Sequence, residues 1–292
     1  MKDDQYVMET APDGAYRFGF GRKEKIFEKQ SPFQKVEIFE TSHHGRVLLH
    51  DGFFMISDRD EAIYHEMIAH VPLFTHSRPQ DILIIGGGDG GTAREVLRHP
   101  GVERCVMVEI DEVVVEACRE YFPQVTRGLK DPRLELLIED GVKYLKECEE
   151  KFDVIIIDST DPIGPATPLF GEEFYADVRR CLKADGIVVA QGESPFYDKG
   201  MQEKLISMNV GHFKYAGFYN FSNLTYPGGL WSFFFASRKN HPVLDLDVER
   251  EEGLEKEPGL NGSFQYYNAD VHRASFSLPQ FQRQRLSEWI TI

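Results

Sequence analysis

Cysteine is scarce in this chain and is never paired at close spacing. The four cysteines are Cys105, Cys118, Cys148 and Cys181; none forms a C-x-x-C motif, and each falls within a predicted strand or helix. This pattern gives no sign of a disulfide framework or of a zinc site built from cysteines. We expect reduced cysteines with a structural role, as in cytoplasmic proteins.

Long apolar runs and an excess of basic residues are also missing. No apolar stretch approaches the roughly 18 residues that span a bilayer, and residues 1–6 lack the pattern of a secretory signal. Lys and Arg number 33 against 48 Asp and Glu, a formal charge of -15 at pH 7. This balance disfavours nucleic acid and anionic membranes as partners and favours cationic substrates, although an acidic excess also simply keeps proteins soluble. We expect a soluble, cytoplasmic protein.

The order of apolar patterns predicts the fold class. Residues 25–57 alternate apolar and polar side chains around a turn at Asp51-Gly52, which predicts a small antiparallel β unit. A helix is predicted over 61–74, closed by Pro72. Strands follow at 82–86, 105–110, 134–139, 153–158 and 186–191, and helices at 90–99, 112–121, 141–148 and 171–182. Such alternation is typical of an α/β fold with parallel strands.

The remaining residues extend this α/β unit. Beyond residue 200 we predict a helix and two late strands, near 217–219 and 230–236, and an acidic stretch at 245–257 forms a solvated loop or helix face. We therefore divide the chain into an N-terminal β domain, residues 1–60, and an α/β domain with a C-terminal extension, residues 61–292.

Residues 81–91 lead from an apolar strand straight into a glycine loop. Gly86, Gly88 and Gly91 satisfy G-x-G-x-x-G, which lets the backbone turn tightly and approach a nucleotide-like ligand. That spacing alone is a weak signal. Glu109 strengthens it, because this acid ends the next strand at the distance where such folds bind the hydroxyl pair of a ribose.

Acids follow four of the predicted strands. In an open parallel sheet the ligand crevice lies outside the carboxyl ends of the strands, so Asp89, Glu109, Asp140 and Asp158 should converge there. Carboxylates around one cleft repel each other unless cations enter it. We expect an adenosine-like ligand with positive charge and a second cation nearby. The alternatives are a loop-capping role for Asp89 and solvent-exposed strand ends for Asp140 and Asp158.

A proline-rich loop, residues 158–170, leaves the last of these strands and has the composition of a lid, although a plain strand-to-helix connection is the alternative. Metal binding is not expected. His65 and His70 are five residues apart, so on a helix their rings point in different directions. His43, His44 and His76 have no partners at ligand spacing and are predicted in turns or at the surface.

Taken in order, these segments resemble the polyamine aminopropyltransferases, the spermidine synthases in particular. The matching segments are GGGDGG at 86–91, VEID at 108–111, EDG at 139–141 and DSTDPIGPA at 158–166, with further likeness at 30–34, 49–52, 60–66, 225–229 and 266–276. Each segment alone is common, but the ordered set is specific and spans nearly the whole chain.

The resemblance implies a fold and a reaction. The fold is a small N-terminal antiparallel β domain followed by a Rossmann-like, methyltransferase-type domain with a mostly parallel sheet, assembled as a homodimer or homotetramer. The reaction moves the aminopropyl group of decarboxylated S-adenosylmethionine, a co-substrate rather than a cofactor, to putrescine, and gives spermidine and methylthioadenosine. We expect small cationic substrates and neither a cofactor nor a metal ion.

The resemblance also implies site residues, carried over by position. Asp158 matches the proton acceptor. The implied substrate-binding residues are Gln34, Glu109, Asp140, Gly141 and Pro165 around the thionucleoside, His65, Asp89, Ser159, Thr160 and Asp161 along the polyamine channel, and Tyr64 and Tyr226 beside the amine. Within this set Glu109 would bind the ribose hydroxyls, and Asp140 with Gly141 the adenine edge. Local sequence alone favours a core position for Tyr64, and it leaves open that Gln34 is a plain strand residue facing solvent and that Tyr226 only forms part of a turn.

Three other functions stay open. The glycine spacing and Glu109 would also suit a nicotinamide dehydrogenase, which does not explain the acids at 140 and 158–161. A methyltransferase acting on a diamine and a non-catalytic polyamine-binding protein are the others. The acceptor is open as well, because Tyr6 stands where many members have tryptophan and Asn223-Leu224 where they have Ile-Pro. A longer polyamine or agmatine is therefore an alternative to putrescine.

Overall fold

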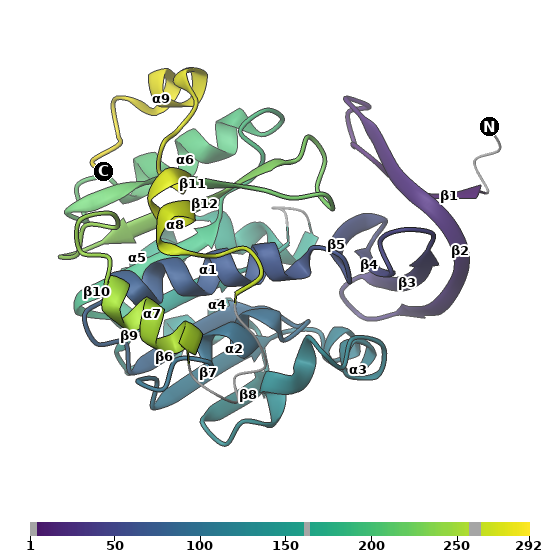
Figure 1. The fold of residues 1–292 in the computed structure, drawn as a ribbon, viewed down its shortest axis with the longest axis horizontal. Coiled ribbons are helices and arrows are strands. Elements are labelled where there is room, and N and C mark those ends of the chain that lie inside the picture. The colour runs from purple at the N-terminus through teal and green to yellow at the C-terminus, as the bar shows by residue number, and fades with distance from the viewer. Residues whose placement is uncertain (1–4, 161–163, 257–263) are drawn as a thin grey trace.

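The computed structural model describes residues 5–160, 164–256 and 264–292, which form two β-sheets and the helices around them (Figure 1). The first sheet is antiparallel throughout and has the order β1-β2-β3-β4-β5. Its strands are β1 (Tyr6–Thr10), β2 (Arg17–Gln30), β3 (Lys35–Thr41), β4 (Arg46–His50) and β5 (Phe53–Ser57). In Figure 1 this sheet stands beside the main body of the molecule, joined to it by the start of α1 (Glu61–Thr75).

The second sheet has seven strands in the order β11-β12-β10-β9-β6-β7-β8. These are β6 (Asp81–Gly86), β7 (Arg104–Glu109), β8 (Leu134–Ile138), β9 (Phe152–Asp158), β10 (Leu182–Gln191), β11 (Tyr215–Ser222) and β12 (Leu230–Ser237). Strands β10, β9, β6, β7 and β8 run parallel, whereas β12 is antiparallel to both of its neighbours. The predicted α/β fold with a small antiparallel unit is confirmed.

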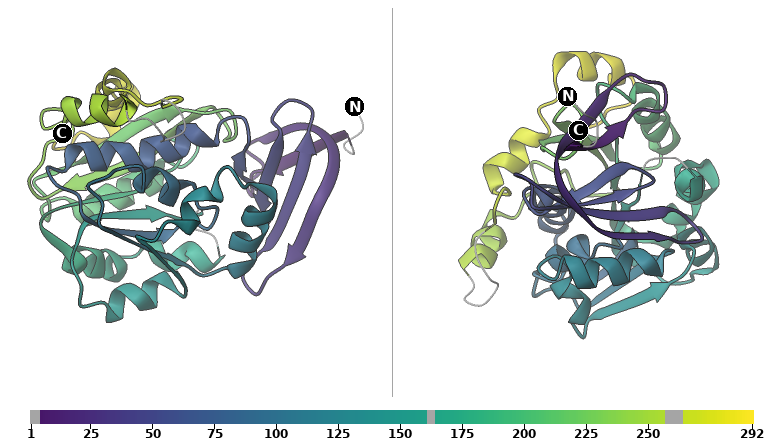
Figure 2. Two further views of the ribbon diagram at one scale, coloured as in Figure 1. Left: turned by 60° about the horizontal axis from the view of Figure 1, so that its bottom comes forward. Right: turned by 90° about the vertical axis from the view of Figure 1, so that its right-hand side faces the viewer.

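Helices cover both faces of this sheet (Figure 2). They are α2 (Gly91–Val96), α3 (Glu112–Tyr121), α4 (Gly141–Glu147), α5 (Glu172–Cys181), α6 (Lys199–Asn209), α7 (Val248–Lys256), α8 (Ala269–Ser275) and α9 (Gln280–Leu286), with short 3-10 turns η2 (Thr126–Lys130) and η3 (Gly164–Phe170). Successive side chains of a strand point to opposite faces, so Ile82 and Ile84 join one core cluster while Leu83 and Ile85 join the other. Burial on both faces explains why the strands are continuous apolar runs rather than alternating ones.

The small sheet is fixed against α3. Val36, Ile38 and Leu48 pack with Val114 and Phe122 in a separate buried cluster. This contact brings β3 and β4 next to the carboxyl end of β7, where α3 begins. The functional site lies in the space between these elements.

Three predicted elements differ from the structure. The antiparallel unit was predicted from residue 25, but β1 and the first half of β2 come before that residue. The alternating pattern is lost in β2 because its burial is irregular and its register against β3 shifts twice. Strand β10 begins at Leu182, inside the helix predicted to end there. Helix α1 continues through Pro72 to Thr75, because a proline there removes one helical N–H without ending the helix.

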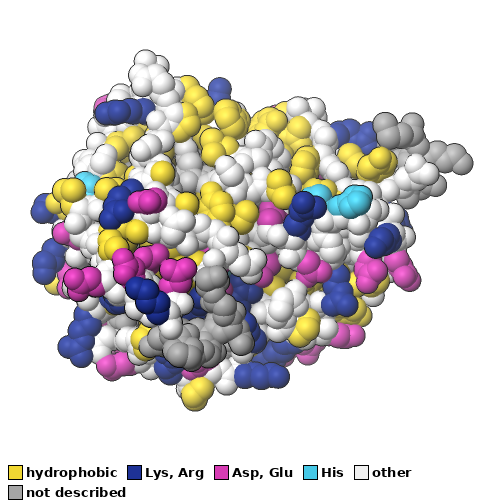
Figure 3. All heavy atoms as spheres, in the orientation of Figure 1, with side chains coloured by type: hydrophobic (Ala, Val, Ile, Leu, Met, Phe, Trp, Pro, Cys, Tyr) yellow, Lys and Arg dark blue, Asp and Glu magenta, His cyan; other side chains and the backbone are white. Residues whose placement is uncertain are grey.

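Two predictions from composition can be compared with the structure. All four cysteines are buried as free thiols. Among the described residues, no helix combines the length and the apolar character needed to cross a membrane. On the face shown in Figure 3, basic and acidic side chains are interspersed, so the acidic excess makes no single negative field there.

Candidate active site

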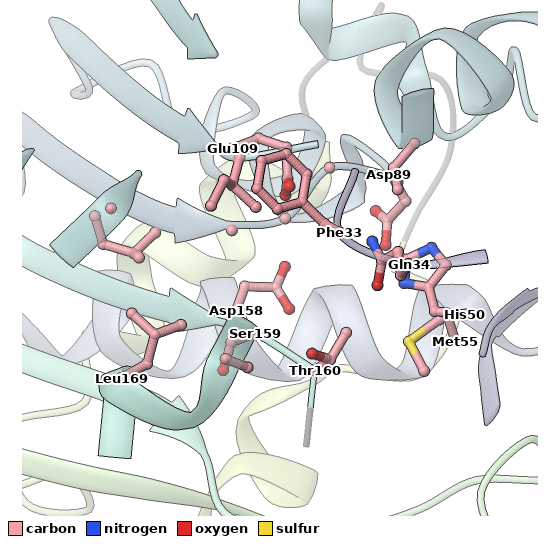
Figure 4. A pocket seen from close by; sticks show the side chains of 18 of the residues that line it. Phe33, Gln34, His50, Met55, Asp89, Glu109, Asp158, Ser159, Thr160 and Leu169 are labelled. Carbon is pink, nitrogen blue, oxygen red and sulfur yellow. The ribbon is translucent and has the colours of Figure 1, made fainter. Parts of the chain in front are cut away.

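A cavity of about 170 Å³ lies between the two sheets. Ten of the predicted site residues line it: Gln34, Tyr64, Asp89, Glu109, Asp140, Gly141, Asp158, Ser159, Thr160 and Tyr226. Figure 4 shows Glu109, Asp89 and Asp158 reaching the same space from different elements. His65 does not line the cavity. Asp161 lies outside the described residues, and for Pro165 only the backbone, at the start of η3, is described.

The glycine loop makes room for two of these acids. Gly86 has a φ of 86°, and a side chain there would overlap the backbone carbonyl of Asp158, its partner across β6 and β9. A methyl group on Gly88 would lie 2.8 Å from Glu109 Oε2. The glycines therefore serve a purpose beyond ligand approach, because they make room for the neighbouring acids.

Asp158 ends β9 and is held by two hydroxyl groups. Tyr64 donates to Oδ1 at 2.7 Å and Thr92 donates to Oδ2 at 2.6 Å. Burial, with the charge of Asp89, raises the pKa of Asp158 above its ordinary value, although the charge of His65 and the two hydroxyls oppose the shift. A carboxylate with a raised pKa is a better proton acceptor. Asp158 also lines the cavity.

Asp89 is paired with a buried histidine. His65 has no exposed surface; its Nε2 lies 3.1 Å from Asp89 Oδ1 and its Nδ1 lies 2.6 Å from Glu61 Oε2. Burial would lower the pKa of His65, but the two carboxylates raise it to about 10, so the ring is an imidazolium at neutral pH. Burial would likewise raise the pKa of Asp89, but His65 and the Gly91 N–H bring it below the ordinary value.

His65 was predicted to line the polyamine channel; in the structure it is fully buried, lies next to Asp89 and is not among the residues that line the cavity. A side chain on Gly91 would overlap the His65 ring, so the last glycine of the loop makes room for this histidine. The side chain that reaches the cavity is Asp89. We describe His65 as a positioning residue that keeps Asp89 charged.

Glu109 and Gln34 meet at the start of α3. Glu109 Oε1 accepts from the backbone N–H of Asp111 at 2.8 Å, and Gln34 Nε2 donates to Asp111 Oδ2 at 3.1 Å. Burial raises the pKa of Glu109 to about 7; the Asp111 N–H opposes this shift, and the charges of nearby acids add to it. Gln34 is therefore not a free strand residue, because it connects the small sheet to the loop that carries Glu109.

Asp140 and Gly141 begin α4 at the far end of the cavity. Asp140 Oδ1 accepts from the backbone N–H of Val142 at 2.8 Å, which makes it the N-cap of the helix. Its side chain is exposed, and its remaining oxygen is available to a ligand. A side chain on Gly141 would lie 2.6 Å from Ile85, so this glycine is required for close packing on β6.

A smaller cavity of about 40 Å³ continues from the first. Tyr64, Thr160 and Tyr226 line both, and the smaller one adds Glu9 and Gln191. Sequence reasoning missed these last two. Glu9 is buried on β1, which was not predicted, and the only signal for it was an acid two residues after the apolar Val7.

His76 was predicted in a turn or at the surface. It lies in the bend that follows α1, but its side chain is only 2% exposed, so the surface alternative is wrong. Its Nε2 lies 3.7 Å from Asp185 Oδ1 and 4.0 Å from Asp153 Oδ1, which is the spacing of a possible metal site. However, Lys183 Nζ already pairs with Asp153 at 2.9 Å. The Arg78 N–H donates to His76 Nδ1, so the ring proton sits on Nε2, the nitrogen that would have to bind the ion. The geometry favours an ion-pair cluster.

Comparison with known proteins agrees with this site. Residues 61–247 match a family model described as the spermine/spermidine synthase domain, and residues 16–58 match the spermidine synthase tetramerisation domain. The second match supports an oligomer. Polyamine aminopropyltransferases from Thermoanaerobacter sp. and Methanocaldococcus jannaschii are 45% and 42% identical; the alignments cover 94% and 91% of this chain and 96% and 90% of theirs.

Solved structures are equally similar. A spermidine synthase in complex with the transition state analogue AdoDATO has a TM-score of 0.91 and 41% identity, covering 97% of this chain and 95% of its own. Spermidine synthase from Thermotoga maritima has a TM-score of 0.88 and 40% identity, covering 97% and 94%. The chain belongs to the spermine/spermidine synthase family and is an enzyme of the polyamine aminopropyltransferase type.

Proposed function

We propose that this enzyme transfers the aminopropyl group of decarboxylated S-adenosylmethionine to putrescine, giving spermidine and methylthioadenosine. The observation that carries the proposal is the meeting of Asp89 and Asp158 with Glu109 in one cavity. Glu109 would bind a ribose, and the other two acids suit positively charged groups. The donor carries a sulfonium and an ammonium, and the acceptor is a diamine, so both substrates match these charges.

The donor would lie along the wall formed by both sheets. Its ribose hydroxyls would bind Glu109, and its adenine would lie by Gln34, Asp140 and Gly141, near Pro165. Its aminopropyl arm would extend toward Asp89. Intact S-adenosylmethionine carries a carboxylate at that end, which Asp89 would repel, so the decarboxylated donor is favoured.

The acceptor would occupy the channel that joins the two cavities. Ser159 and Thr160 line it, with Asp161 next in the chain, and the rings of Tyr64 and Tyr226 offer aromatic faces to an ammonium group. The hydroxyl of Tyr226 donates to the Met55 carbonyl at 2.8 Å, which fixes the ring on β5. The far amine would reach the smaller cavity.

Asp158 is the proposed proton acceptor. In-line displacement at the carbon beside the sulfonium releases a neutral thioether, so it needs no metal ion, cofactor or covalent intermediate. The attacking amine must be unprotonated, yet at neutral pH only about one alkylamine in a thousand is, because its pKa is near 10.4. Asp158 suits the role because burial raises its pKa, while desolvation lowers that of the amine.

The reaction is tested by mass spectrometry of the products. The enzyme is incubated with decarboxylated S-adenosylmethionine and, separately, putrescine, cadaverine, agmatine or spermidine. We expect methylthioadenosine in each productive reaction and the fastest turnover with putrescine. In a parallel reaction with intact S-adenosylmethionine, formation of methylated amines would indicate a methyltransferase. Binding of the amines without any product would indicate a non-catalytic polyamine-binding protein. Quenching of nicotinamide fluorescence on titration would indicate a dehydrogenase.

Binding of methylthioadenosine is expected to weaken as the pH falls below about 7. The pKa of Glu109 is raised to about 7, so its carboxyl gains a proton there, and ribose hydroxyls bind the carboxylate better than the acid. Kd should rise toward about tenfold per pH unit below the pKa. Calorimetric titrations from pH 8 to 5.5 measure this. In Glu109→Gln binding should be weak at every pH, and a wild-type Kd that is constant over the range would contradict the assignment.

We also propose that the enzyme is a cytoplasmic homodimer or homotetramer. The match of residues 16–58 to a tetramerisation domain supports an assembly through the small sheet. Light scattering after size-exclusion chromatography would give the mass of the assembly directly.

A further inference from the structure

His50 lines the donor side of the main cavity, although no motif pointed to it. It ends β4, and its side chain is 9% exposed. Figure 4 shows its ring beside Gln34 and Met55, on the same side of the cavity as Asp89. The ring comes from the small sheet, whereas Asp89 comes from the loop after β6.

Both ring nitrogens of His50 lack a hydrogen-bond partner among the described residues. A buried polar group without a partner costs about 1–3 kcal/mol, so proteins rarely keep one without a use. An apolar residue would fill the same position at the end of β4 without this cost. An occupant of the cavity that hydrogen-bonds the ring would remove the cost.

The charge state of His50 determines which ligand group it suits. Burial lowers its pKa to about 4, against the opposing charges of Asp111, Asp89 and Asp51. The ring is therefore neutral at pH 7 and has one nitrogen lone pair to offer. The three carboxylates make the surroundings negative, so a positively charged donor group is favoured there over a neutral one.

We propose that His50 recognises the cationic half of the donor. Its ring would accept a hydrogen bond from the ammonium group at the end of the aminopropyl arm. This inference rests on the proposed function, because it concerns the same cavity. It separates two kinds of contact with the donor: Glu109 and Gln34 would bind the nucleoside, and His50 with Asp89 would bind the charged arm. His50 is thus a specificity residue that favours the charged donor over the neutral product, methylthioadenosine.

The test compares two ligands on His50→Leu. Affinities for decarboxylated S-adenosylmethionine and for methylthioadenosine are measured by calorimetry without acceptor. We expect the donor Kd to rise about tenfold or more, the effect of losing one hydrogen bond to a charged group, and the methylthioadenosine Kd to change less than about twofold. The melting temperature of the ligand-free variant should not fall, because an unpartnered polar group has been replaced by an apolar one.

The matched control is His43→Leu, the same substitution at an exposed position in the loop between β3 and β4, outside the cavity, which should alter neither Kd. If His50→Leu does not fold, His50→Gln serves in its place, with the same selective loss at smaller size. Equal losses for both ligands, or no loss for the donor, would overturn the proposal. If the wild-type enzyme bound neither ligand, the proposed function itself would fail, so the two failures are distinguishable.

Discussion

Turnover in Asp158→Asn is expected to fall by a factor of about 100 or more, the usual contribution of a general base. Asparagine has nearly the same size, but its one carbonyl oxygen can accept from only one of the two hydroxyls that hold Asp158, those of Tyr64 and Thr92, and its NH2 group must donate to the other. Its amide cannot take a proton from the amine. The measurement is steady-state production of methylthioadenosine with saturating donor and acceptor. The wild-type rate should also fall at low pH, as Asp158 becomes protonated, and the variant should lack this dependence.

Binding separates a lost base from a damaged site. Methylthioadenosine affinity should be unchanged in Asp158→Asn, because the nucleoside is proposed to bind Glu109 and Gln34. Thr92→Val is a matched comparison, since it removes one hydrogen bond to Asp158 and keeps the carboxylate. Its turnover should fall by less than about tenfold. Near-normal turnover in Asp158→Asn would mean that the proton leaves by another route.

His65→Leu is expected to destabilise the enzyme by about 3 kcal/mol at pH 7. Removing one member of a buried ion pair leaves the other charge unpaired, which costs about 3–5 kcal/mol. The lower value applies because Glu61 would still be paired with Arg94, whose NH2 atom lies 2.9 Å from Glu61 Oε2. Asp89 loses its cation, so the KM for the donor should also rise. Urea unfolding measures the first effect and steady-state kinetics the second.

The pH dependence of stability distinguishes this role from simple packing. The pKa of His65 is raised from 6.5 to about 10 in the folded state. A raised pKa contributes stability that is fully present below pH 6.5 and is lost as the pH rises through 10. Wild-type stability should decline over that window. In His65→Gln, which keeps an amide donor, the decline should be absent and the loss at pH 7 smaller. The same decline in this variant would contradict the charge assignment.

The convergence of acids could be predicted because it depends only on strand order. Once β6, β7 and β9 are parallel neighbours, Asp158 lies opposite Gly86 and Glu109 ends the adjacent strand. Local apolar runs and glycines determine where these strands end. The sequence pattern was therefore sufficient to predict that Asp158 and Glu109 lie close together. The alternatives given for two of the acids also hold in part. Asp89 accepts from the Gly91 N–H at the start of α2, as a capping residue would, and Asp140 is exposed at the end of its strand, where it also caps α4.

Other features depend on how the two sheets dock, which no local pattern encodes. Glu9 and His50 reach the cavities only because the small sheet packs on α3. The burial of His65 depends on α1 packing against the glycine loop, where Gly91 leaves space for the ring. A histidine beside a tyrosine on a helix gives no sign of whether it points into a channel or behind it.

The division of the donor pocket between two sheets has a consequence for cooperativity. His50 ends a strand of the small sheet and Gln34 lies in the turn just before β3, whereas Glu109 and Asp158 end strands of the large sheet. A nucleoside bound as proposed would therefore touch both sheets at once. The free energy of nucleoside binding would oppose separation of the two sheets. It would add to the stabilisation from the apolar contact between the small sheet and α3. Saturation with methylthioadenosine should thus merge the unfolding of the two sheets into one sharper calorimetric transition.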